Sequence, residues 1–281
     1  MYNGTLYEKD ITIMKLLGTD NNKIIKLITM NALKKPQENL LEENQENKNK
    51  LTKKNTVNDE KLSNNITRAK TKIFELAFCN KWDYFITLTI DSRKYNREDL
   101  QKYYKDLSQF IRDCRKKYKC DIEYLLIPEL HKDNKSWHLH GLVKGIPLSK
   151  LKHFEVGDKM SKGISEKVKN GEDVYNWLEY QNKFGFCDLE PIKSEQAVSK
   201  YITKYITKDL KSTVDEIGAH LYYRSNNLKT AITIKKGILL KTIEPCYIGE
   251  YCKITELAFT QELFDEIKDN IVPNCYFKEW E

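Results

Sequence analysis

Hydrophobic and polar residues fall into distinct blocks along the chain, and each block predicts one part of the fold. Two short apolar runs, Ile11–Leu17 and Ile24–Met30, flank a polar turn and predict a β-hairpin within residues 1–34. Residues 35–65 are dominated by Asn, Lys, Glu and Gln, so they cannot bury enough apolar surface to offset the entropy of ordering. We interpret this stretch as a linker or as a solvated, partly helical segment.

From Ile66 onward the pattern predicts alternating helices and strands. A helical stripe of apolar residues runs from Ile66 to about Asn80, and Asn96 can cap a second helix that ends near Tyr118. Residues 148–180 are expected to be mixed and mostly helical. Stretches rich in β-branched and aromatic residues predict strands, at 84–90, 122–130, 137–144 and 184–191, with further candidates at 220–224 and 230–234.

The C-terminal region carries a short strand near 247–254 and an amphipathic helix near 260–270. Strands joined by hairpins together with separate helices are typical of an α+β protein. We therefore expect four parts, namely an N-terminal hairpin (1–34), a polar linker (35–65), a main α+β domain (66–235) and a C-terminal extension (236–281).

Composition narrows the class of protein. Of the 281 residues, 40% are apolar, which supports a real core, and the net charge of +7 favours an anionic partner such as nucleic acid. The same lysines could serve only to solvate the surface. Seven cysteines without a Cys-x-x-Cys pair indicate a reduced, intracellular protein. No apolar run approaches the ~20 residues that cross a bilayer, and no apolar signal region is present, so we expect a cytoplasmic location and no membrane partner.

The strand predicted at 137–144 carries a histidine pair that could hold a metal ion. His138 and His140 are two residues apart, so both imidazoles point to the same side of the strand. Glu129 lies across the hairpin from them, at about 5 Å. This set leaves coordination positions open, which suits Mg²⁺ or Mn²⁺ and is compatible with zinc. His131 would be a fourth contact or lie outside the ligand set. Ordinary packing is the alternative for such a pair.

A second candidate site is the run Tyr201-Ile-Thr-Lys204 followed by Tyr205-Ile-Thr-Lys208, on a helix that Ser194 can cap. On one helix both phenols share a face, and each has a lysine three residues later. A phenol has an ordinary pKa near 10, so a nearby ammonium or metal ion would favour the nucleophilic phenolate. Attack on a phosphodiester would store bond energy in a covalent link. The alternative is a surface helix whose phenols pack against a strand.

Three motifs in this order resemble those of the HUH endonucleases, specifically the rolling-circle replication initiators of small phages and plasmids. The resemblance covers about residues 66–235 and rests on the segments Phe85-Ile86-Thr87-Leu88-Thr89, Trp137-His138-Leu139-His140-Gly141, and Tyr201-x-x-x-Tyr205 with Lys204. Pro128-Glu129 lies where related initiators place a carboxylate ligand. The segment 224–229 resembles a later part of phage members, without a role that we can assign from sequence.

The resemblance implies a central antiparallel sheet of about five strands flanked by helices, as in HUH and RRM-like folds. It implies nicking of one DNA strand at an origin, which leaves a 5′-phosphotyrosine and a 3′-hydroxyl that primes synthesis, and a later rejoining step through the second tyrosine. Partners would be single-stranded or supercoiled origin DNA, a host polymerase and, because no Gly-x-x-x-x-Gly-Lys-Ser/Thr loop occurs, a separate helicase. We expect phosphate contacts from the basic residues of the tyrosine segment, Lys200, Lys204, Lys208 and Lys211.

Two other classes remain open at this point. Relaxases and single-strand transposases share the chemistry, but relaxases usually carry their tyrosine ahead of the histidines and transposases typically use one tyrosine. A non-catalytic single-strand binder would need exposed aromatic residues on the sheet for base stacking. It would not need Glu129 opposite two histidines.

Overall fold

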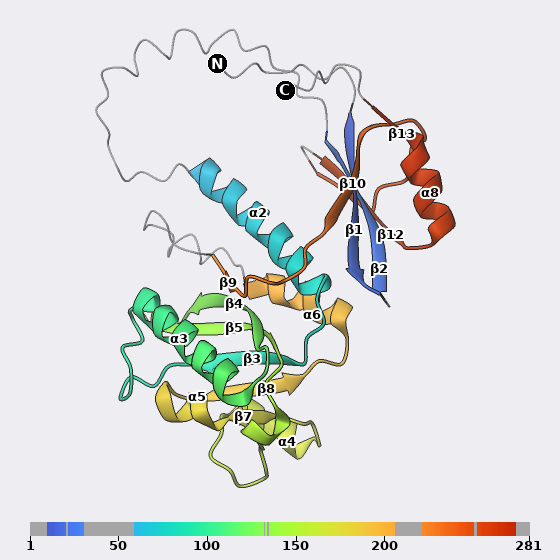
Figure 1. Cartoon of the computed structure of the whole chain (residues 1–281). Helices are drawn as coiled ribbons and strands as arrows, with labels where there is room; N and C mark the ends of the chain where they lie inside the picture. The colour runs from blue at the N-terminus through green and yellow to red at the C-terminus, as the bar shows by residue number, and fades with distance from the viewer. Residues whose placement is uncertain are drawn as a thin grey trace, which may run out of the picture. The chain divides into compact units, whose positions relative to one another are not determined.

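The structure is a computed structural model that describes residues 10–20, 22–30, 59–131, 133, 135–205, 221–249 and 252–273 (Figure 1). It contains helices and two antiparallel sheets, which confirms the α+β class. The chain divides into two compact units, one formed by residues 1–56 with 230–281 and the other by residues 57–229. None of the described helices combines the length and apolarity that a bilayer crossing requires.

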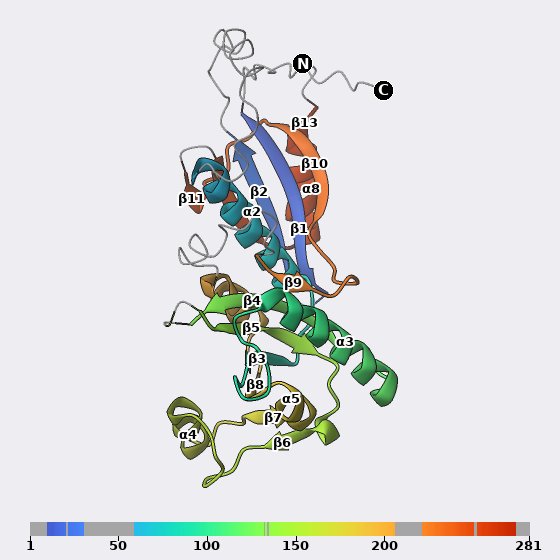
Figure 2. The ribbon, with the colours of Figure 1, turned by 90° about the vertical axis from the view of Figure 1, so that its left-hand side faces the viewer.

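The first unit is a six-stranded antiparallel sheet with one helix, α8 (Gln261–Asn270), along one face (Figures 1 and 2). Its strands in sheet order are β11 (Tyr247–Ile248), β12 (Cys252–Ala258), β2 (Asn22–Met30), β1 (Ile11–Thr19), β10 (Ile232–Leu239) and β13 (Ile271–Val272). The predicted N-terminal hairpin is present, with Thr19 opposite Asn22. The predicted C-terminal helix is also present as α8, whose Ile267 is buried.

The strand expected at 230–234 was assigned to the wrong sheet. It forms part of β10, which pairs with β1 and β13 in the six-stranded sheet. The physical reason is that Ile234 and Leu239 pack with the buried residues Met14 and Leu27 of the hairpin and Ile267 of α8. The N-terminal hairpin and the C-terminal segment therefore share one hydrophobic core.

The second unit is a seven-stranded antiparallel sheet with helices on both faces. Its strands in sheet order are β6 (Leu151–His153), β7 (Tyr175–Trp177), β8 (Cys187–Pro191), β3 (Tyr84–Thr89), β5 (Trp137–Lys144), β4 (Glu123–Leu130) and β9 (Tyr223–Arg224). Its helices are α2 (Asp59–Phe78), α3 (Leu100–Tyr118), α4 (Lys162–Lys169), α5 (Leu178–Lys183) and α6 (Glu195–Ile202), with 3₁₀ turns η1 (Leu148–Lys150) and η2 (Thr203–Tyr205).

Two details differ from the prediction. The region expected to be mostly helical contributes β6 and β7, which are three residues each and therefore too short to show a periodic pattern. Helix α2 begins at Asp59 rather than at Ile66, within the stretch that we interpreted as a linker. The rest of that stretch, residues 35–58, lies outside the described residues.

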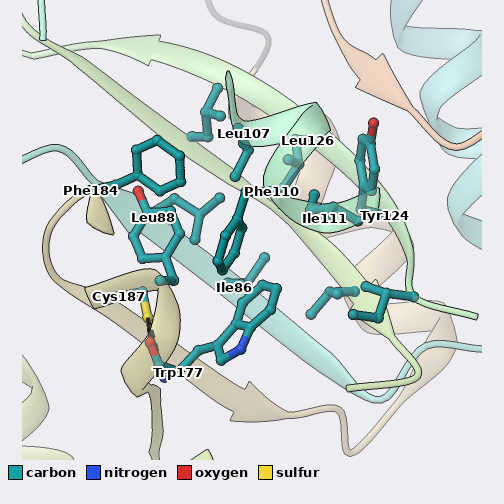
Figure 3. Packing of buried hydrophobic residues seen from close by; sticks show 14 of the residues in the cluster. Ile86, Leu88, Leu107, Phe110, Ile111, Tyr124, Leu126, Trp177, Phe184 and Cys187 are labelled. Atoms are coloured by element: carbon teal, nitrogen blue, oxygen red, sulfur yellow. Dashed lines mark hydrogen bonds between the residues drawn. The ribbon is translucent and has the colours of Figure 1, made fainter. Parts of the chain in front are cut away.

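One face of the seven-stranded sheet packs on α3 and α5. Ile86 and Leu88 alternate on β3 toward this face, and Phe110 of α3 points into the centre of the cluster (Figure 3). The Phe110 ring lies 5.0 Å from the Trp177 ring and 5.6 Å from the Phe184 ring, measured between centroids. This aromatic core holds the central strands in place from one side.

The opposite face packs on α2 and α6. Ile73 of α2 and Ile202 of α6 are fully buried and contact Leu125, Ile127 and Leu142 of the two central strands β4 and β5. Because strand side chains alternate, the residues between those of the α3 face point toward α6.

The segment 224–229, for which sequence alone gave no role, anchors the edge of this unit. The Ser225 hydroxyl accepts hydrogen bonds from the Tyr124 backbone N–H (3.0 Å) and from the Arg115 guanidinium (3.2 Å). The Asn80 side-chain amide donates to the Lys229 carbonyl (2.8 Å) and accepts from the Lys229 N–H (3.0 Å). These bonds satisfy backbone groups that would otherwise be left unpaired at a sheet edge and at the end of a helix.

Candidate active site

The two histidines stand on the α6 face of the sheet, on the central strand β5. In the register of the neighbouring strands, Glu129 of β4 and Thr89 of β3 lie opposite His138, and Thr87 lies opposite His140. The carboxylate Oε2 of Glu129 is 2.7 Å from Nε2 of His140. The hairpin geometry expected from the turn near residue 134 is therefore present.

Threonine hydroxyls from β3 contact the other ring nitrogen of each histidine. Thr89 Oγ1 is 3.1 Å from His138 Nδ1, and Thr87 Oγ1 is 3.5 Å from His140 Nδ1. A ring nitrogen that is engaged in this way fixes the orientation of the imidazole and directs the Nε2 atom toward a ligand. Both contacts come from the strand whose Phe-Ile-Thr-Leu-Thr sequence formed the first motif.

Electrostatics keep this cluster in the ionisation states that a cation site requires. The hydrogen bond with His140 holds the pKa of the Glu129 carboxyl below its usual range. Burial, and then the neighbouring rings of His131 and His140, lower the pKa of His138, so this imidazole is neutral near pH 7. His131 stacks on His138, with ring centroids 5.0 Å apart.

The donor chemistry fits a divalent cation, although the ligands are not closed around one point. Within the described part of the chain, no set of three or more His, Cys, Asp or Glu side chains is arranged so as to hold a metal ion. Glu129 and His140 are in contact, and the His138 ring lies 6.4 Å from the His140 ring. A carboxylate oxygen and imidazole nitrogens on one rigid hairpin are ligands that Mg²⁺, Mn²⁺ or zinc accepts.

The tyrosine segment begins as predicted but does not continue as one α-helix. The Ser194 hydroxyl caps α6 by accepting from the Ala197 N–H (3.2 Å). The helix ends at Ile202, and Thr203–Tyr205 form a 3₁₀ turn, so the prediction of a continuous helix with both phenols on one α-helical face was wrong. The Thr203 hydroxyl donates to the Lys200 carbonyl (2.7 Å), and such a local bond favours a tighter turn.

Tyr201 and Lys204 adjoin each other, as the sequence predicted. Tyr201 is 46% exposed, and Lys204 Nζ lies 5.7 Å from the centroid of its ring. Lys200 is exposed on α6. The side chain of Tyr205, together with Lys208 and Lys211, lies outside the described residues.

Phe85 connects the phenol to the histidine cluster. Its ring meets the Tyr201 ring edge-on at 5.5 Å and lies 6.3 Å from the His140 ring, both between centroids. The phenol and the imidazole therefore lie on the same face of the sheet, with one aromatic ring between them.

Asp188 is a residue of this face that the sequence reasoning missed. It lies opposite Thr87 on β8 and is only 7% exposed. Burial, and then repulsion from Glu190, raise the pKa of Asp188 to about 6, and a hydrogen bond with Thr87 opposes that rise. The signal was present in the sequence, because Asp188 and Glu190 alternate with the apolar Cys187 and Leu189 as the histidines do on β5.

Comparison with known proteins agrees with this geometry. Residues 83–210 match a family model of replication-associated proteins of the ORF2 type. Neither the curated proteins nor the solved structures include a match to the chain. The matched residues contain β3, the histidine pair and Tyr201, and the match supports a family of rolling-circle replication initiators.

Proposed function

We propose that this protein nicks one strand of DNA at a replication origin by attack of a tyrosine, and later rejoins the strand ends. The observation that carries the proposal is the row Tyr201, Phe85, His140 and Glu129 on one face of the sheet. An exposed phenol and a carboxylate–imidazole pair are the two parts that metal-assisted phosphoryl transfer needs. Both parts lie within the residues that match replication-associated proteins.

Glu129, His138 and His140 would hold the cation, Mg²⁺ or Mn²⁺. When bound, the cation would offset negative charge on the phosphate oxygens. The contribution of the chain is to fix its ligands in advance. Thr87 and Thr89 orient the two rings through Nδ1, and the sheet holds Glu129 against His140 before any substrate arrives.

The covalent step balances as follows. The Tyr201 hydroxyl loses its proton to water, and its oxygen attacks the phosphorus of a phosphodiester. The bond from phosphorus to the 3′-oxygen breaks, and the leaving 3′-oxygen takes up a proton. The products are a 5′-phosphotyrosine and a free 3′-hydroxyl, and the phosphoester energy is kept for rejoining. The Lys204 ammonium beside the Tyr201 ring favours the phenolate form.

The remaining basic residues and the second tyrosine have supporting roles in this scheme. Tyr205 would perform the second cleavage after one round of synthesis. Lys200, Lys204, Lys208 and Lys211 would contact the DNA backbone through sequence-independent charge. A polymerase and a separate helicase would act on the product, because the chain itself contains no nucleotide-binding loop.

A label-transfer assay tests the chemistry without knowledge of the origin. The full chain is incubated with Mn²⁺ and a pool of single-stranded oligonucleotides of random sequence, labelled at the 3′ end in one sample and at the 5′ end in another. We expect the 3′ label to become attached to the protein and to survive denaturation. The 5′-labelled fragment should be released and should be extended by a polymerase.

Three results would contradict the proposal. They are attachment of the 5′ label, an adduct that persists when Tyr201 and Tyr205 are both changed to Phe, and an adduct that forms equally well in EDTA. The matched control is Tyr247→Phe, which alters an exposed tyrosine of the other unit. That variant should behave as the unmodified protein does. Binding of DNA without any adduct would favour the non-catalytic single-strand binder.

A further inference from the structure

A groove of about 800 Å³ adjoins Tyr201 on the α6 face of the second unit. We call it the Tyr201 groove. Phe85 and Tyr201 line one end, the loop 170–173 after α4 forms one wall, and residues 190–194 with Ala197 and Val198 of α6 form the other. Its volume lies within the roughly 300–1,000 Å³ that is typical of sites for small flat ligands.

The charges of the groove disfavour a phosphate group. Its ammonium groups already have carboxylate partners, since Lys167 pairs with Glu190, and Lys193 lies 3.6 Å from Glu172. Asp173 adds a further carboxylate. With more carboxylates than ammonium groups along its walls, the groove repels a phosphodiester and offers acceptors for N–H donors.

The remaining lining fits an aromatic ring with a polar edge. Phe85, Ile192 and Val198 provide an apolar surface, while the Glu172 carboxylate and the Asn170 amide provide hydrogen-bonding groups. Bases of single-stranded nucleic acid are bound in this manner, by contact with aromatic and apolar side chains and by hydrogen bonds to the base edge.

We infer that the Tyr201 groove binds one nucleobase of the substrate strand next to the phosphate that Tyr201 attacks, and that it favours a base with an amino group over thymine. The inference rests on the proposed function and deepens it, because it assigns part of the sequence preference at the cleavage site to named residues. A carboxylate such as Glu172 accepts from the amino group of cytosine, whereas thymine presents a carbonyl oxygen at the same place.

Two variants with matched controls test the inference. Ala197→Trp fills the groove, and Gln196→Trp places the same side chain on the same helix outside it. Glu172→Gln removes the charged acceptor, and Glu98→Gln makes the same change at an exposed site elsewhere. In the first readout, both fragments from the random-pool reaction are sequenced for each protein. In the second, fluorescence anisotropy in EDTA compares binding of oligo-dC with binding of oligo-dT of equal length.

We expect the unmodified protein to disfavour thymine about tenfold at one position beside the cleaved bond, which is the effect of one hydrogen bond to a charged acceptor. We also expect it to bind oligo-dC more tightly than oligo-dT in EDTA. Glu172→Gln and Ala197→Trp should each remove both preferences, and the two controls should keep them.

The outcomes separate this inference from the nicking proposal. If adducts form but Ala197→Trp and Glu172→Gln leave the base preference unchanged, the groove is not a base site, and the nicking proposal stands. If no adduct forms but the oligo-dC preference is present and is lost in both variants, the groove binds a base, and the nicking proposal fails. Equal affinity of the unmodified protein for oligo-dC and oligo-dT overturns the inference in either case.

Discussion

Replacing Asp188 with Asn should make the protein more stable at neutral pH, which is an unusual expectation for a buried residue. Asp188 is 7% exposed, and burial raises its pKa to about 6. An Asp in the unfolded chain has a pKa near 3.9. Between these two values the folded state holds a proton that the unfolded state has lost, so stability falls as the pH rises.

The magnitude follows from that difference. A shift of about two pKa units corresponds to about 3 kcal/mol, which is absent below about pH 4 and fully present above about pH 6. An Asn side chain has nearly the same size and no charge, so the variant should escape this loss. The free energy of unfolding of Asp188→Asn, minus that of the unmodified protein, should therefore rise by up to about 3 kcal/mol between about pH 4 and about pH 7.

The assay is urea unfolding of the full chain at both pH values in EDTA. Other titrating groups cancel when the two proteins are compared at each pH. A difference between the proteins that does not change with pH would refute the reasoning. A second readout connects the group to the cation site. Added Mn²⁺ should stabilise the unmodified protein more than Asp188→Asn at pH 7, because a nearby cation favours the ionised carboxyl.

Three other changes test separate parts of the structure. Thr89→Val removes the hydroxyl that contacts His138 Nδ1 at 3.1 Å and should weaken Mn²⁺ binding about 10–100-fold in titration calorimetry; unchanged affinity would contradict a role in orienting the ring. Lys204→Ala should slow adduct formation roughly two- to fivefold while DNA affinity falls less, because the ammonium acts on the Tyr201 ring; an equal loss in both would reduce it to a phosphate contact. Leu107→Ala, in the α3 core, should lower the free energy of unfolding by about 2–5 kcal/mol, and a loss under about 1 kcal/mol would place Leu107 outside a packed core.

The strands of the second unit were predictable where the local signal was strong. Trp137–Lys144 was predicted with the observed bounds, because alternation and the preceding polar turn both define it. The same reasoning placed Glu129 across from the histidine pair. Register within a hairpin depends on a short turn, so it can be read from adjacent residues.

Features that depend on distant contacts were not predictable. The strand at 230–234 has the same local pattern in either sheet, and only its packing against the N-terminal hairpin decides its partner. The end of α6 at Ile202 depends on a hydroxyl that bonds locally, which the apolar period of four does not report. Asp188 was missed because its importance arises from burial beside Thr87, which lies in another strand.

The central claim is that the Tyr201 phenol and the His138, His140 and Glu129 cluster serve one phosphate from the same face of the sheet. Fluorine NMR of protein labelled with 3-fluorotyrosine tests it directly, with the Tyr201 signal identified by its loss in Tyr201→Phe. Titrated Mn²⁺ should broaden that signal strongly, and His140→Ala should prevent the broadening. A Tyr201 signal that stays sharp while Mn²⁺ binds through the histidines would contradict the account.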